Sequence, residues 1–237
     1  MITAIILLGG IGSRLNKETP KQFIKINDKE MFLYSLETFL SVEDINKIVL
    51  VIEKNSFNEV KDILSKNKIS NKKVHLCIGG KTRQESSFNG LSYIKNNFKN
   101  CTFVLIHDAA RPLVSKMTIK KNITAVKKFG ATSTFIDIND SIVKSKYDKI
   151  ENYLNRDEIK IIQTPQAFKF SLIYKAHLNT KSTFNDDSSL IKNNGYNIRL
   201  VKGDIFNFKV TTKQDLKLLE AITKQKWVKN YFIKKKI

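Results

Sequence analysis

A turn rich in glycine, followed by two cations, is the first place in this chain where chemistry is expected. The apolar run of residues 2–8 ends in a turn that has glycine at three of its positions 9–12, and Arg14 and Lys21 follow it. Glycine permits positive φ and lets backbone N–H groups approach an anion. Arginine and lysine then neutralise phosphate charge. The stretch predicts a site for a polyanion such as a nucleoside triphosphate.

Two familiar phosphate-binding loops are excluded here. A Walker loop ends in Gly-Lys-Ser/Thr, whereas Gly12 is followed by Ser13 and Arg14. The dinucleotide fingerprint needs a third glycine where this chain has Leu15. The simple alternative is a surface turn beside an exposed cation.

A carboxylate at the end of a predicted strand is the second candidate. Residues 104–108 read Val-Leu-Ile-His-Asp, and Arg111 follows shortly after. Open α/β sheets bind ligands at the carboxyl ends of their strands, and a carboxylate there can hold Mg²⁺ against triphosphate oxygens. The alternative is that Asp108 merely pairs with Arg111 or caps the next helix.

Strand and helix patterns alternate along the chain and would position these residues. The apolar spacing predicts strands at 2–8, 47–52, 73–78 and 103–107, and helices at 31–40, 57–64, 85–97 and 117–129. Such alternation predicts an α/β fold of the Rossmann-like kind, a mostly parallel sheet with helices on both faces. The length of 237 residues suits a single domain, 1–237.

The pattern changes at residues 138–161. Two short stretches, 141–144 and 149–153, alternate around a turn at 145–148. They predict a two-stranded β-arm that leaves the domain. An isolated hairpin is only marginally stable in water, so the arm is expected to pack on something.

Composition narrows the class of protein. The net charge is +20, but the lysines are spread over nearly every predicted helix and the aromatic residues form no stacking platform beside them, so a nucleic-acid partner is not predicted. No apolar run approaches the ~20 residues that cross a bilayer, which predicts a soluble protein without a membrane partner. Cys77 and Cys101 lack metal or redox spacing and are expected to be buried free thiols in a reducing cytoplasm. The three histidines are scattered, so no zinc site is expected, and the basic run 224–236 is expected to be a frayed terminal helix.

The motifs together resemble the nucleotidylyltransferases of sugar and polyol phosphates. The glycine turn, Arg14 and the string Pro20-Lys21-Gln22-Phe23 are similar to the cytidylyltransferases that act on 2-C-methyl-D-erythritol 4-phosphate or ribitol 5-phosphate. Further segments agree in order and spacing: 79–91, 104–112, Arg156 with 163–168, and 186–216. The resemblance therefore covers nearly the whole chain.

This resemblance implies a reaction. A phosphate oxygen of the acceptor attacks the α-phosphorus of CTP, pyrophosphate leaves, and a CDP-polyol forms. It implies Mg²⁺ as cofactor, a cytoplasmic enzyme, and a homodimer in which the arm clasps a second subunit and completes its acceptor site.

The resemblance also implies roles for single residues. Arg14 and Lys21 would stabilise the reacting phosphate and the leaving pyrophosphate, Asp108 would hold Mg²⁺, and Lys209 with Arg156 from a partner's arm would hold the acceptor phosphate. Residues expected to contact the substrates are Leu7, Leu8, Gly9, Gly10, Gly80, Lys81, Arg83, Ser86 and Asp108, with Ser141 and Thr164 near the acceptor.

The motifs divide between two acceptors. Gly9 and Phe206 resemble the ribitol branch, which would make CDP-ribitol for teichoic acid or capsule; residues 82–86, 109–110 and 186–188 resemble the methylerythritol branch, which serves isoprenoid precursor synthesis. We favour methylerythritol phosphate. Uridylyl or adenylyl transfer is the nearer alternative, and a non-catalytic nucleotide-binding or RNA-binding protein of this fold is the alternative from another class.

Overall fold

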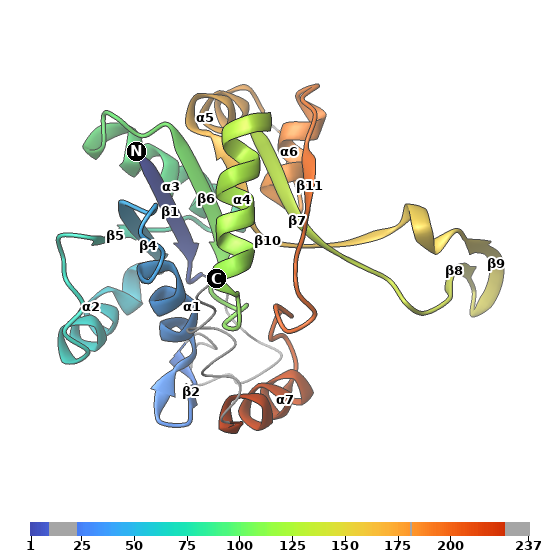
Figure 1. Ribbon diagram of the computed structural model, residues 1–237, viewed down its shortest axis with the longest axis horizontal. Helices are drawn as coiled ribbons and strands as arrows, with labels where there is room; N and C mark the ends of the chain where they lie inside the picture. The colour runs from blue at the N-terminus through green and yellow to red at the C-terminus, as the bar shows by residue number, and fades with distance from the viewer. Residues whose placement is uncertain (10–22, 181, 226–237) are drawn as a thin grey trace.

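A seven-stranded mixed sheet forms the centre of the molecule. The computed structural model describes residues 1–9, 23–180 and 182–225 (Figure 1). Strand order is β11-β7-β10-β6-β1-β4-β5. Pairings are parallel except those of β10, which runs antiparallel to β6 and β7. The bounds are β1 Ile2–Leu7, β4 Lys47–Ile52, β5 Val74–Ile78, β6 Phe103–Asp108, β7 Ala131–Asp137, β10 Lys160–Lys169 and β11 Arg199–Lys202. The predicted α/β class is confirmed.

Helices cover both faces of this sheet. On one face lie α1 Met31–Leu40, α2 Phe57–Lys66 and α4 Lys116–Phe129; the other carries α3 Arg83–Asn97, α5 Phe170–Asn179 and α6 Asp187–Asn193. In Figure 1, α4 crosses in front of the strands. Neighbouring residues of β1 show the two layers, since Ile6 belongs to the same core cluster as Phe39 of α1 and Ile5 to that of Leu91 of α3. Burial on both faces explains why the central strands are continuous apolar runs.

Local signals fix where the helices begin and end. The Thr82 side chain accepts from the backbone N–H of Glu85 and caps α3, and Ser115 does the same for α4. Helix α4 ends at Gly130, whose φ of 79° favours glycine. The predicted helices 31–40, 57–64, 85–97 and 117–129 therefore match α1 to α4 within two residues.

The chain reverses direction across the sheet between β1 and β6. From β1 it goes outward to β4 and β5 and then returns to β6 on the other side of β1. The carboxyl ends of β1 and β6 thus form the switch point, where such sheets bind ligands. Register pairs Leu7 with Asp108, so Gly9 follows β1 at the level of the carboxylate.

The predicted arm is present as a two-stranded sheet. Strands β8 Ile142–Lys146 and β9 Lys149–Leu154 join through Tyr147 and Asp148, both with positive φ. A 3-10 turn, η3 Arg156–Glu158, leads back to β10, and the arm projects from the body of the molecule (Figure 1). Tyr147 is 86% exposed and Tyr153 72% exposed. In one chain, the arm's large apolar side chains are thus left in solvent.

A small third cluster closes the carboxyl end of the sheet. The hairpin β2 Lys25–Ile26 and β3 Lys29–Glu30 packs against α7 Lys213–Lys224 through a core that includes Ile26, Met31, Val210 and Leu219. A further 3-10 turn, η2 Lys54–Ser56, precedes α2. The predicted basic helix 224–236 falls almost wholly outside the described residues.

The two cysteines and the apolar content of the helices were also the subject of predictions from composition. Cys77 and Cys101 are both free thiols, as expected, but they are only partly buried. Burial raises the pKa of the Cys77 thiol to about 11, so it is protonated at neutral pH. Within the described ranges, the structure contains no helix with the length and apolar content that would span a membrane.

Candidate active site at the switch point

Gly9 and Gly80 meet at the carboxyl edge of the sheet. A Cβ placed on Gly9 would lie 3.8 Å from the Ser86 hydroxyl oxygen, so Gly9 neighbours the start of α3. The Gly80 N–H donates to that hydroxyl at 3.1 Å, and the Lys81 N–H donates to Glu85 Oε2 at 2.7 Å. Gly9 and Gly80 thus lie beside the amino end of α3, whose helix dipole favours an anion.

The residues predicted to contact the nucleotide differ in whether their backbone or their side chain is available to a ligand. Leu7 and Leu8 are buried, and the Leu8 N–H donates to the carbonyl of Val51. Their side chains belong to the core, so any contact with ligand comes from the backbone. Gly80 is also constrained, because a Cβ there would lie 2.3 Å from Cβ of Glu85. Lys81 is exposed at the rim.

Asp108 lies between two cations at the end of β6. Its Oδ1 accepts from Arg83 Nε at 3.0 Å, and its Oδ2 accepts from Lys209 Nζ at 2.9 Å. Burial alone would raise the pKa of this carboxyl, but the Arg83 guanidinium and the Lys209 ammonium outweigh burial and hold the pKa well below its usual range. The carboxylate is therefore ionised at neutral pH.

Asp108 does not form the ion pair with Arg111 that was the simple alternative for it. Arg111 directs its guanidinium to backbone carbonyls instead, donating to Asn207 at 2.9 Å and to Ile162 at 3.4 Å. Asp108 pairs with residues from α3 and from the segment after β11. It therefore joins distant parts of the chain and does not cap a neighbouring helix.

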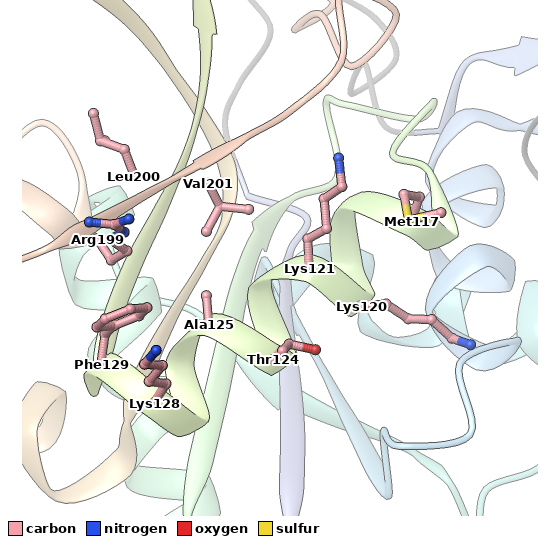
Figure 2. A pocket seen from close by; sticks show the side chains of 10 residues that line it. All are labelled: Met117, Lys120, Lys121, Thr124, Ala125, Lys128, Phe129, Arg199, Leu200 and Val201. Carbon is pink, nitrogen blue, oxygen red and sulfur yellow. The ribbon is translucent and has the colours of Figure 1, made fainter.

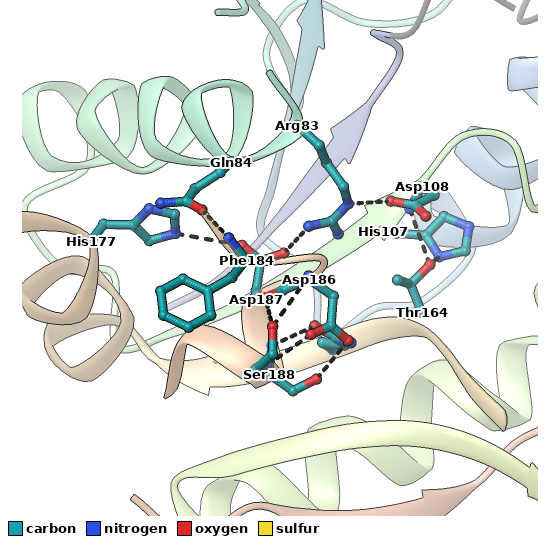
Figure 3. Close-up of polar contacts among 12 residues, drawn as sticks. Arg83, Gln84, His107, Asp108, Thr164, His177, Phe184, Asp186, Asp187 and Ser188 are labelled. Atoms are coloured by element: carbon teal, nitrogen blue, oxygen red, sulfur yellow. Dashed lines mark hydrogen bonds and ion pairs between the residues drawn. The ribbon is translucent and has the colours of Figure 1, made fainter. Parts of the chain in front are cut away.

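A buried histidine orients the backbone beside Asp108 (Figure 3). His107 Nε2 lies 3.1 Å from the carbonyl oxygen of Arg111, and Nδ1 lies 3.0 Å from the Thr164 hydroxyl. Because a carbonyl can only accept, we assign the proton to Nε2, so that Nδ1 accepts from Thr164. The Thr164 oxygen in turn accepts from the Asp108 N–H at 3.1 Å. Burial lowers the pKa of His107 to about 4, which keeps the ring neutral.

The charges continue away from Asp108 on the other side of Arg83. Arg83 Nη1 donates to Asp187 Oδ2 at 2.7 Å, and the other oxygen of Asp187 lies 3.4 Å from His177 Nε2 (Figure 3). Asp187 is the first residue of α6 and His177 belongs to α5. One guanidinium thus bridges two carboxylates, Asp108 at the end of β6 and Asp187 at the start of α6, that are far apart in the sequence.

The carboxylate of Asp108 fits the protein's share of a magnesium site. Among the described residues, no group of three or more His, Cys, Asp or Glu side chains comes together as a metal cage. Mg²⁺ needs no such cage when it takes most of its ligands from phosphates and water. Asp108 is ionised, and each of its oxygens retains a lone-pair site beyond the one that accepts from a cation.

The remaining predicted site residues fall into two groups. Gly10, Arg14 and Lys21 lie outside the described residues. Arg156 and Ser141 belong to the arm, where Arg156 Nη1 donates to the carbonyl of Asn139 at 2.8 Å. The fold of one chain thus gathers Gly9, Gly80, Arg83, Ser86, Asp108, Thr164 and Lys209 at the switch point, and carries Ser141 and Arg156 on the projecting arm.

A separate groove lies between α4 and β11 (Figure 2). It has a volume of about 460 Å³ and an apolar floor that includes Val201 and Phe129. The Arg199 guanidinium lies 5.1 Å from the centre of the Phe129 ring. The residues that line this groove include none of the predicted site residues, so the groove is distinct from the switch point.

Three functional candidates escaped the sequence analysis as site residues: His107, His177 and Asp187. His107 and Asp187 each stand in a motif that the resemblance identified; His107 precedes Asp108, and Asp187 follows Asp186. Their partners are far away in sequence, since Arg83 and Asp187 are separated by 104 positions. Adjacency to Asp108 was the available signal for His107, and the shared motif was the signal for Asp187, but spacing along the chain cannot show the pairing of Asp187 with Arg83.

A switch-point site with glycine turns at a helix start and an ionised carboxylate between cations defines an α/β enzyme that handles phosphorylated substrates. The sequence profile of the IspD family, 2-C-methyl-D-erythritol 4-phosphate cytidylyltransferase, matches residues 2–225. The chain belongs to this family and is a cytidylyltransferase, which confirms the resemblance and its methylerythritol branch.

Individual relatives agree with this assignment. The 2-C-methyl-D-erythritol 4-phosphate cytidylyltransferase of Thermosipho africanus is 40% identical over 92% of this chain and 96% of its own length. The corresponding protein of Clostridium tetani is 39% identical over 94% of this chain and 90% of its own. The crystal structure of 4-diphosphocytidyl-2C-methyl-D-erythritol synthase from Anaerococcus prevotii superposes with a TM-score of 0.81 at 30% identity, covering 94% of this chain and 98% of the other.

Proposed function

We propose that this protein transfers the cytidylyl group of CTP to 2-C-methyl-D-erythritol 4-phosphate, forming the CDP-polyol and releasing pyrophosphate. The family match supports this reaction. The observation that carries it in the fold is Asp108 held between Arg83 and Lys209, beside the carboxyl end of β1. The acceptor phosphate is already ionised at neutral pH, so no side-chain nucleophile is needed.

Charge neutralisation and alignment are the main tasks in this reaction. An anionic acceptor must approach an anionic triphosphate, so cations that neutralise both groups and fix them in line lower the barrier. Lys209 faces the switch point and is the described candidate for the acceptor phosphate. Arg14 and Lys21, outside the described residues, remain our candidates for the reacting phosphate and the leaving pyrophosphate.

The backbone around the two glycine turns is proposed to hold the cytidine nucleotide. The N–H groups near Gly9, Gly80 and Ser86 lie beside the amino end of α3, where an anion is favoured. Arg83 and Lys81 add positive charge on the same side, and Thr164 lies next to Asp108 toward the acceptor.

Magnesium is proposed as the cofactor, with Asp108 as its protein ligand. When bound, Mg²⁺ would supply positive charge to the triphosphate oxygens. The Asp108 carboxylate also holds Lys209 at 2.9 Å, so the same side chain orients the cation proposed for the acceptor phosphate. Asp108 is therefore the position of the site where a substitution would disturb two proposed functions at once.

The working unit is proposed to be a homodimer. The exposed apolar side chains of the arm, including Tyr147, Ile150 and Tyr153, support a partner surface there. In that assembly Arg156 and Ser141 would reach the partner's acceptor site. We also propose one domain, 1–237, with 138–161 as the dimerisation arm, and a cytoplasmic enzyme, as its free cysteines suit a reducing compartment.

Pyrophosphate release tests the proposal directly. The protein is incubated with CTP and Mg²⁺, and 2-C-methyl-D-erythritol 4-phosphate and D-ribitol 5-phosphate are supplied in parallel reactions. We expect turnover with the methylerythritol phosphate. Turnover with ribitol phosphate alone, or with neither acceptor, would overturn the proposed substrate.

A further inference from the structure

The ion pair between Asp108 and Arg83 is extended by a second carboxylate, that of Asp187. Arg83 Nε donates to Asp108 and Nη1 donates to Asp187, so one guanidinium is shared between a carboxylate at the site and one behind it (Figure 3). The side chain of Asp187 is only 1% exposed. Asp187 is therefore remote from solvent and reaches the switch point only through Arg83.

A buried charge of this kind needs a physical reason. Burial on its own would raise the pKa of Asp187, but Arg83 and His177 outweigh burial and hold the pKa below its usual value. Removing an ion from water costs several kcal/mol unless its partners compensate. Here the compensation comes from Arg83, whose planar guanidinium presents its donors in fixed directions. Asp187 thus fixes the plane in which Arg83 meets Asp108.

The orientation of Arg83 decides what remains for Lys209. With one donor held by Asp187, Arg83 meets only Oδ1 of Asp108, and Oδ2 is left to accept from Lys209. A guanidinium freed from Asp187 could turn toward Asp108 and use two donors on both carboxylate oxygens. Lys209 would then lose the contact that places its ammonium group.

We infer that Asp187 is a positioning residue for the transfer reaction, acting through Arg83 on Asp108 and Lys209, and that His177 supports it. His177 Nε2 lies 3.4 Å from Oδ1 of Asp187, the oxygen that does not accept from Arg83, and its ring stacks on Phe88, with ring centres 5.7 Å apart and planes 17° from parallel. Phe88 belongs to α3, the helix that begins at Arg83. This inference rests on the proposed function, because it assigns Lys209 to the acceptor.

Asp187→Asn tests the inference, since it keeps the shape of the side chain and removes its charge. We expect kcat/KM for the methylerythritol phosphate to fall ~10–100-fold, the range typical of groups that orient a ligand-binding side chain. The KM for CTP should change less than threefold. Ser189→Ala is the matched control, because it weakens the capping box at the start of α6 without touching the Asp187 carboxylate. Its melting temperature should fall while its kcat/KM stays within about twofold.

A double-mutant cycle separates positioning from general damage. If Asp187 acts through Arg83, the double variant Asp187→Asn with Arg83→Gln should be no less active than Arg83→Gln alone. The inference would be overturned if the fold-losses in kcat/KM of the two single variants multiplied in the double variant. It would also be overturned if Asp187→Asn left kcat/KM unchanged, or if Ser189→Ala lowered kcat/KM as much as Asp187→Asn does. Wild-type protein that turns over neither acceptor would instead overturn the proposed function.

A second pair of variants decides the question if Asp187→Asn does not fold. His177→Phe keeps a ring to stack on Phe88 but removes the nitrogen near Asp187, and Phe88→Leu removes the stack but keeps that nitrogen. We expect His177→Phe to lower acceptor kcat/KM by ~3–10-fold, at the lower end of such effects, and Phe88→Leu to lower only the melting temperature. The reverse pattern would contradict the role of Asp187.

Discussion

Lys209 combines exposure to the site with a fixed position. Its side chain is 39% exposed and its ammonium group contacts Asp108. Replacing it by alanine removes the cation proposed for the acceptor phosphate. We expect Lys209→Ala to lower kcat/KM for the acceptor by ~100-fold, as the loss of a charge-assisted contact of about 3 kcal/mol would, and to leave the melting temperature within a few degrees.

Steady-state kinetics with the acceptor varied at saturating CTP measures this effect. Lys213→Ala at the start of α7 serves as control, because Lys213 is an exposed lysine nearby in sequence. Equal rates in the wild type and Lys209→Ala would remove Lys209 from the acceptor site.

His107 makes a prediction about stability at acid pH. Its pKa is about 4 in the folded protein against 6.5 when unfolded, so between these values the unfolded state binds the extra proton. The free energy of unfolding therefore rises with pH over this window, and stability is lost as pH falls from 6.5 through 4. The shift corresponds to about 3 kcal/mol.

Denaturant unfolding of the wild type and His107→Gln at several pH values checks this sign. The variant should show a flatter dependence between pH 6.5 and 4, whatever its stability at neutral pH. Parallel curves for the two proteins would mean that His107 is not held neutral in the fold.

Sequence reasoning at the residue scale found the carboxylate and its cation but not their connections. Asp108 and Lys209 were singled out because a strand end and a motif indicate them. The sharing of Arg83 between two carboxylates depends on how α3, β6 and α6 pack. Spacing along the chain carries no information on such contacts.

At the scale of elements, the turn that leads into α3 should tolerate no side chain at Gly80. A Cβ there meets Glu85, which itself accepts from the Lys81 N–H. We expect Gly80→Ala to move the turn and to raise the KM for CTP ~10-fold, about 1.4 kcal/mol of lost binding. The acceptor's KM should change much less.

Gly130→Ala is the matched control for this glycine. Gly130 has a φ of 79° at the end of α4 and open space around its Cβ position, far from the glycine turns. Alanine there should cost about 1 kcal/mol of stability without altering nucleotide kinetics. If both variants alter the KM for CTP equally, the Gly80 turn has no special role.

The strands that the sequence analysis identified in the first half of the sheet have an apolar pattern that β7 lacks. Strands β1 and β4 were predicted because branched apolar residues fill them. Strand β7 is buried through Thr132, Ser133 and Thr134, whose hydroxyls bond to Asn122, Ser188 and strand β10. A hydrophobic pattern cannot reveal a strand whose buried side chains are polar and satisfied by hydrogen bonds. The polar residues Gln163 and Thr164 conceal part of β10 in the same way.

At the scale of the whole molecule, the arm makes the proposed active site a shared one. A substitution of Arg156 would then inactivate the site of the partner subunit, whereas a substitution of Lys209 would inactivate the site of the chain that carries it. In a mixture of the two inactive variants, half of the randomly formed dimers are mixed, and one of the two sites in each mixed dimer is intact. Activity should return to about a quarter of the wild-type value.

Mixing Arg156→Ala and Lys209→Ala proteins under conditions that allow subunit exchange measures this recovery. Each variant exchanged with itself provides the baseline. Activity that stays at the baseline while mixed dimers are demonstrably present would show that Arg156 and Lys209 serve the same chain's site.

Strand β10 connects the arm, the proposed active site and the core of the sheet. This single strand begins at Lys160 beside the arm, passes Thr164 next to Asp108, and ends around Phe168, which is fully buried. One strand therefore connects the arm to the core by way of the residue that contacts Asp108. Strand β7 pairs with β10 from Lys160 onward, so a displacement of the arm would be carried toward Thr164 by two paired strands together.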